Sequence, residues 1–161
     1  MAKTKEATKN IAGPKTGSPK SSNEEIKPIK YEDKSEGQPE LVAIFKELRT
    51  ILLQQVQGNL TVQGDSGGQV HLYSIKPVEI MGKKRGGVYF ASLLVQKGYV
   101  GFYLMPVYVD SFLKQSIEPE LLKLLKGKSC FHIKKLDDIL KSQVQKALQE
   151  GYDCYAKKGW V

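Results

Sequence analysis

Two apolar runs, at about 88–96 and 99–105, constrain the fold of this chain more than any other feature. A short glycine-containing turn separates them, which is the pattern of a β-hairpin. Strict alternation puts Phe90 and Leu94 on one face of the first run and Tyr89 on the other. Because both faces are largely apolar, we expect central strands, covered by helices on one face and by loops or a partner on the other.

Further strands and two long helices are predicted around this hairpin. Apolar residues recur every three or four positions over 39–57 and 137–156, which indicates an amphipathic helix at each end of the folded part. Residues 81–87 are predicted to form a loop. The order predicts an α+β two-layer sandwich, an antiparallel sheet of about five strands with the N- and C-terminal helices on one face. The shorter strands are predicted at 60–65, 70–75 and 129–133.

Composition divides the chain into two parts. Residues 1–38 are rich in Lys, Ser, Thr, Pro, Gly and Glu, and Tyr31 is their one aromatic residue. Such a segment buries too little apolar surface to offset an ordering entropy of about 1–2 kcal/mol per residue. We therefore predict a disordered basic tail over 1–38 and a folded domain over 39–161. No secretory signal and no spanning stretch of roughly 20 apolar residues is visible, which predicts a cytoplasmic protein without a membrane partner.

The net charge of +8 favours an anionic partner but does not select one. The densest positive cluster, Lys83–Arg85, precedes two glycines whose backbone N–H groups can approach an anion closely. We predict a ligand- or anion-binding site around this loop, which Lys128, Lys134 and Lys135 extend if their strand lies nearby. A solvated loop is the alternative. The predicted site residues are Lys83, Lys84, Arg85, Lys128, Tyr103 and His132.

Six aromatic residues crowd the hairpin and its neighbours. On an exposed sheet face beside cations, they would form a stacking platform for single-stranded nucleic acid. Packing in the core is the commoner use, and a ligand cleft or a homodimer surface on the sheet are others. Nucleic acid is therefore favoured less as a partner than a small ligand, iron or an acidic protein. The six residues are Tyr89, Tyr99, Phe102, Tyr103, Tyr108 and Phe131.

Cys130 and His132 lie two residues apart on one face of a predicted strand. They could serve as a nucleophilic pair, or as part of a metal site with Cys154 or His71. A nucleophile needs an exposed thiolate of low pKa and a third, orienting group, and the sequence supplies neither. We expect free thiols with Cys130 buried, and we favour a non-enzymatic role over a small-ligand enzyme that uses Cys130 and His132.

Four short motifs occur in the folded part of the chain: Tyr-Phe-Ala at 89–91, Val-Gln-Lys-Gly-Tyr-Val at 95–100, Pro-Glu-Leu at 119–121 and Gly-Lys-Ser-Cys-Phe-His-Ile-Lys-Lys at 127–135. Taken together, they resemble the bacterial family of unknown function 1801, the YdhG-like proteins, over roughly 40–157. The resemblance implies an α+β fold. Part of that family is described as frataxin-like iron chaperones, which implies intracellular iron handling.

An iron surface of the frataxin type is a ridge of carboxylates on the first helix and first strand, since hard iron prefers oxygen ligands. Glu40, Glu47 and Asp65 are the candidates here. The sequence therefore predicts a non-enzymatic binding or chaperone-type module, with iron handling implied by the resemblance and no other cofactor. Polyanion or nucleic-acid binding through the Lys83–Gly87 loop is the alternative.

Overall fold

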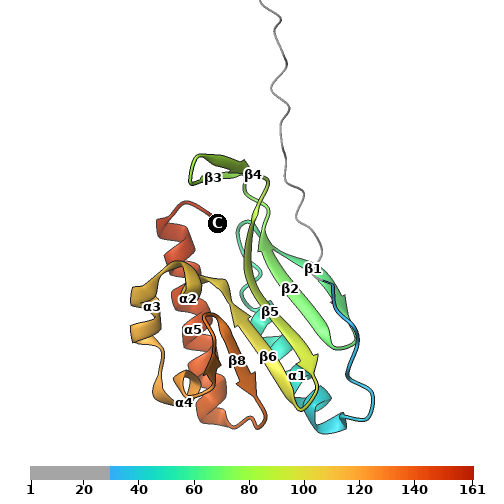
Figure 1. The fold of residues 1–161 in the computed structure, drawn as a ribbon. Helices are drawn as coiled ribbons and strands as arrows, with labels where there is room; N and C mark the ends of the chain where they lie inside the picture. Colours follow the sequence, from blue (N-terminus) through green and yellow to red (C-terminus); the bar gives the residue numbers. More distant parts are fainter. Residues whose placement is uncertain (1–29) are drawn as a thin grey trace, which may run out of the picture.

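Two long helices cover one face of an antiparallel sheet in residues 30–161, the part of the chain that this computed structural model describes (Figure 1). Helix α1 (Pro39–Leu53) and helix α5 (Asp138–Lys157) pack against each other behind the sheet. Both present an apolar stripe to the strands, as the periodicity of the sequence predicts. The α+β architecture with helices at both ends is confirmed. Residues 1–29 of the predicted tail lie outside the described residues.

The sheet has six strands in the order β1-β2-β5-β6-β8-β7, and every neighbouring pair is antiparallel. The prediction of about five strands misses β7, which is only two residues long. The predicted hairpin forms the centre of the sheet as β5 and β6. The strands are β1 (Leu60–Ser66), β2 (Gln69–Ser74), β5 (Val88–Gln96), β6 (Tyr99–Leu104), β7 (Leu125–Lys126) and β8 (Cys130–Ile133).

The segment predicted as a loop at 81–87 is instead part of a separate hairpin. Strand β3 (Val78–Ile80) pairs with β4 (Lys83–Arg85), and Figure 1 shows this hairpin projecting beyond one end of the main sheet. Met81 and Gly82 form its turn with φ angles of 52° and 75°. A two-residue turn with both residues in the left-handed region matches the twist of the paired strands, so the hairpin closes despite a methionine at the first position.

Three short helices link β6 to β7. They are α2 (Met105–Val109), α3 (Ser111–Ser116) and α4 (Pro119–Leu122), and each contacts α5. Asp110 caps α3 by accepting a hydrogen bond from Phe112 N at 2.9 Å. These helices lie beside the β8–β7 edge of the sheet, so that this edge and the start of α5 come close together (Figure 1).

A bulge in β5 decides which side chains of the central strand face the helices. The register leaves Phe90 as an extra residue between Tyr89 and Ala91, and both Phe90 and Ala91 are fully buried in the core. Beyond the bulge the alternation is shifted by one residue, so Leu94 lies on the face opposite Phe90. The predicted grouping of Phe90 with Leu94 is therefore wrong.

The described end of the predicted tail, residues 30–38, contacts the central hairpin. Tyr31 Oη donates to Val95 O at 2.9 Å, and Gln38 Nε2 donates to Gln96 O at 3.0 Å. Gly98 N donates back to Gln38 Oε1 at 2.8 Å. These bonds attach residues 30–38 to backbone groups at the turn end of β5 and β6.

Tyr155 tests the packing of α5 on the sheet. Its side chain is fully buried, its hydroxyl donates to Tyr89 O at 2.7 Å, and its ring lies edge-on to Phe90 with centroids 5.5 Å apart. Tyr155→Phe leaves the Tyr89 carbonyl without this donor, so we expect the free energy of unfolding to fall by about 1 kcal/mol in urea denaturation. Tyr152→Phe is the matched control, because the Tyr152 hydroxyl has no hydrogen bond to any described residue. Equal losses in both variants would contradict this account.

Candidate functional site

An open groove of about 500 Å³ lies at the edge of the sheet, where β8 passes the start of β7. Its walls come from α4, β7, the end of β8 and the first turn of α5. We call it the β8 groove. Its cations are Lys123, Lys126, Lys134 and Lys135, its carboxylates are Glu120 and Asp137, and His132 joins them from β8.

The carboxylates of the β8 groove are already engaged, whereas most of its lysines are not. Glu120 pairs with Lys123 at 3.0 Å. Asp137 is the N-cap of α5 and accepts from Leu140 N at 2.8 Å. Within residues 30–161, the other three lysines of the groove have no ion pair. The groove therefore carries a surplus of positive charge that its own carboxylates do not neutralise.

His132 connects the groove to the open face of the sheet, the face that α1 and α5 do not cover. Its ring stacks on Tyr99, with centroids 3.8 Å apart and an interplanar angle of 12°. Partial burial lowers the pKa of His132, and the charges of Lys126 and Lys134 lower it further. The imidazole is therefore largely neutral at pH 7, and an anion in the groove would favour its protonated form.

A glycine makes room for the aromatic side chains beside His132. Gly101 lies opposite His132 in the register of β6 and β8, and a Cβ there would be only 2.7 Å from Cε2 of Tyr103. The Tyr103 ring thus lies over Gly101, and burial is the main cause that raises its pKa to about 12. Tyr99, Tyr103 and His132 gather over this glycine, and we call these three rings the aromatic face.

A buried polar network lies further along the open side of the sheet. His71 is 2% exposed, and it accepts from the Ser92 hydroxyl at Nδ1, 2.6 Å away. Its Nε2 donates to Gln69 Oε1 at 2.9 Å. Burial lowers the pKa of His71, so the ring is neutral with both nitrogens satisfied. Ser92 is fully buried, which keeps this serine–histidine pair away from any substrate and leaves it a structural role.

The predicted site residues fall in three places. Tyr103 and His132 come together on the aromatic face. Lys128 lies in the turn between β7 and β8, where its Nζ is 5.3 Å from the centroid of the Tyr108 ring. The Lys83–Arg85 cluster forms β4, which Figure 1 places at the far end of the molecule from β8.

The six aromatic residues do not form one surface. Phe102 and Phe131 are fully buried and stack on each other in the core, 5.5 Å between centroids. Tyr108 is on α2 and is 55% exposed. Sequence reasoning did not find Lys123 and Lys126, because their approach to His132 depends on α4 and on a strand too short for a sequence pattern to indicate.

Two of the three candidate iron ligands are held in ion pairs. Asp65 accepts from Arg49 Nε at 2.9 Å, and this bond lowers the pKa of the Asp65 carboxyl. Glu47 pairs with Lys141 at 2.5 Å, while Glu40 lies in the first turn of α1. In the described part of the chain, no three His, Cys, Asp or Glu side chains gather in a way that could hold a metal ion.

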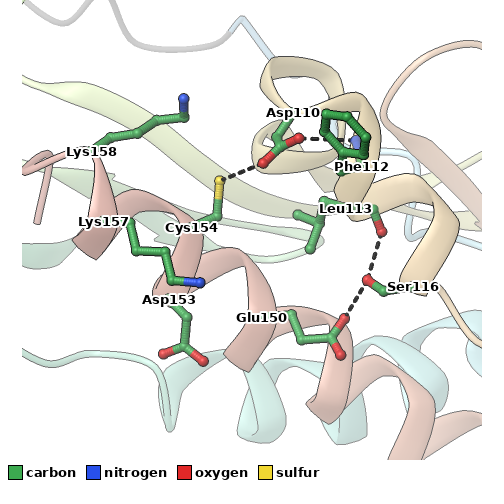
Figure 2. A pocket seen from close by; sticks show the side chains of 9 residues that line it. All are labelled: Asp110, Phe112, Leu113, Ser116, Glu150, Asp153, Cys154, Lys157 and Lys158. Carbon is green, nitrogen blue, oxygen red and sulfur yellow. Dashed lines mark hydrogen bonds between the residues drawn. The ribbon is translucent and has the colours of Figure 1, made fainter.

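A second cavity, of about 550 Å³, lies between α3 and α5 (Figure 2). Cys154 Sγ is 3.8 Å from Asp110 Oδ2, and Ser116 donates to Glu150 at 2.8 Å. Burial raises the pKa of Cys154, and the charge of Asp110 raises it further. Lys157 and Lys158 also line the cavity and oppose this rise, but the pKa of Cys154 stays above its ordinary value, so the setting does not activate the thiol.

Both cysteines are free, but the prediction that Cys130 is buried is wrong. Cys154 is the buried cysteine and Cys130 is half-buried. Burial raises the pKa of the Cys130 thiol, and a hydrogen bond with Tyr103 partly opposes this rise. A low-pKa thiolate, which a cysteine nucleophile requires, is therefore not what this environment favours.

Comparison with family models, with curated proteins and with solved structures finds no match for this chain. The resemblance to the YdhG-like family therefore rests on the quoted motifs and stays a prediction. None of the helices in residues 30–161 combines the length and the apolar character needed to cross a bilayer.

The two histidines report separately on the β8 groove and on the buried network. By NMR titration, we expect both to have a pKa below the ordinary value of 6.5. Lys134→Gln removes a positive charge near His132, so the pKa of His132 should rise while that of His71 stays unchanged. An unchanged pKa of His132 would show that Lys134 points away from the groove.

Stability should depend on pH because burial lowers the pKa of His71 in the folded state. The unfolded chain takes up its proton near pH 6.5, whereas the folded protein does so only at a lower pH. Stability is thus fully present above about pH 6.5 and falls as the pH drops toward the folded pKa. Urea denaturation at neutral pH and at about pH 5.5 should show this loss of stability. His71→Asn should make the loss between these two pH values smaller. His132→Asn should reduce it as well, since the pKa of His132 shifts in the same direction.

Proposed function

We propose that this protein is a non-enzymatic binding module that holds a polyanion in the β8 groove. The observation that carries the proposal is the set of three lysines, Lys126, Lys134 and Lys135, which surround the groove without an ion pair in the described residues. A chain of negative charges that meets several such cations releases bound counterions and gains affinity from each contact.

The reactive groups of the chain support binding rather than catalysis. The Ser92 hydroxyl is buried against His71, and burial raises the pKa of both thiols. The lysines instead lie around an accessible groove. A cytoplasmic location and membership of the YdhG-like family are parts of the same proposal.

Iron handling receives less support from the arrangement of side chains. An iron ion on the first helix and strand would have to displace Arg49 from Asp65 and Lys141 from Glu47. The polyanion proposal requires no ion pair to break, because Lys126, Lys134 and Lys135 are available in the described structure.

Inorganic polyphosphate tests the proposal because it is a polyanion without aromatic groups. We expect the full chain to bind it with an affinity that falls steeply as salt increases. The Lys126→Gln/Lys134→Gln variant should bind about tenfold more weakly in fluorescence anisotropy competition, since two exposed ion contacts contribute up to about 1 kcal/mol each.

The matched control removes the same two charges from the other basic cluster. Lys83→Gln/Lys84→Gln changes β4, which lies away from the groove, so its affinity should stay within about twofold of the wild-type value. A larger loss in this β4 variant than in the groove variant would move the anion site to the β3–β4 hairpin. No binding of polyphosphate at low salt would overturn the proposal.

A further inference from the structure

We infer that the polyanion is single-stranded nucleic acid, with an unpaired base stacked on the aromatic face beside the β8 groove. This inference rests on the proposed function and names the chemistry of its ligand. It starts from the position of His132, which lines the groove and also stacks on Tyr99 on the open face of the sheet. A ligand that fills the groove with its charged backbone therefore reaches the ring surfaces directly.

The geometry of the aromatic face suits a planar group. The rings of Tyr99 and His132 are nearly parallel, at 12°, so each presents its second face outward from the pair. All three rings are partly exposed, and within residues 30–161 no helix lies in front of this side of the sheet (Figure 1). Gly101 keeps the floor beneath them flat, because any side chain at that position would collide with Tyr103.

Cations flank this face at both ends of β8. Lys126 of β7 is paired with Cys130 at the start of the strand, and Lys134 and Lys135 follow its last residue. A strand rises about 3.3 Å per residue, so Lys126, level with Cys130, and Lys134 are separated by roughly 13 Å along the strand. This spacing places charge on either side of the rings, which is how sheet surfaces hold a strand of nucleic acid with its bases stacked on aromatic side chains.

Single-stranded nucleic acid fits these features better than an acidic protein does. Both would satisfy the lysines, but only unpaired bases offer the flat π-surfaces that match stacked rings. A duplex keeps its bases inside the helix, so a double strand would use the lysines alone. The hydroxyl of Tyr103 also stays protonated well above neutral pH, so the face adds no negative charge that would repel a phosphate.

The experiment compares two ligands of equal length and charge. One is an oligothymidylate of about ten nucleotides, within the usual range of site sizes, and the other is the matching abasic deoxyribose-phosphate oligomer. With the full chain, we expect the oligothymidylate to bind at least about tenfold more tightly than the abasic oligomer, since stacking contributes that much per base.

Substitutions on and off the aromatic face separate stacking from charge. Tyr99→Leu should remove most of the advantage of the base-containing ligand and leave the abasic affinity unchanged. Phe112→Ala is the matched control, since Phe112 is 77% exposed on α3 and its loss should change neither affinity. In the wild type, the His132 ring resonances should shift with oligothymidylate and not with the abasic oligomer, which tests stacking without any substitution.

The outcomes distinguish the two proposals. Equal affinities for the two oligomers, both weakened by Lys126→Gln/Lys134→Gln, would overturn the stacking inference and leave the polyanion groove standing. An advantage for the oligothymidylate that survives Tyr99→Leu, with no shift at His132, would also overturn it. No binding of either oligomer or of polyphosphate at low salt would overturn both.

Discussion

The packing of α1 and α5 on one side of the β5–β6 hairpin is the constraint on which the rest of this structure depends. Phe90, Phe102 and Tyr155 are fully buried where the two layers meet, and each buries a large apolar surface. Since both long helices use the same face, no helix within residues 30–161 covers the opposite face of the sheet. The aromatic face and the buried His71 network both lie on that second side.

Sequence patterns predicted the layers of this fold but not the details that decide which side chains are accessible. The 3.6-residue periodicity of the terminal helices and the apolar hairpin needed no tertiary information. The bulge at Phe90 could be found only from the tertiary structure, because a single extra residue reverses the faces of the rest of the strand without changing its composition. Phe102 and Phe131 belong to the core for a similar reason, since only the register of β6 with β8 pairs them.

The candidate site was harder to predict than the fold because it depends on charge partners far apart in the sequence. Lys83–Arg85 is the densest run of cations, and sequence density made it the leading candidate. The β8 groove instead combines Lys123 just after α4, Lys126 of β7, and the two lysines that follow β8. Its positive charge also depends on the fact that its two carboxylates already have partners. Glu120 pairs with Lys123, and Asp137 caps α5. No local sequence pattern predicts such a balance of free lysines and paired carboxylates.

The hydrogen bonds that buried polar atoms already make limit what this surface can recognise. In the described residues, every buried side-chain nitrogen and oxygen has a hydrogen-bond partner, and His71 uses both of its ring nitrogens internally. His71 therefore has no spare ring nitrogen with which to read the edge of a base. Affinity at the aromatic face then comes mainly from ring surfaces and from lysines, which attract any base and any phosphate alike. A ligand held in this way would be selected for being single-stranded and anionic, and only weakly for its sequence.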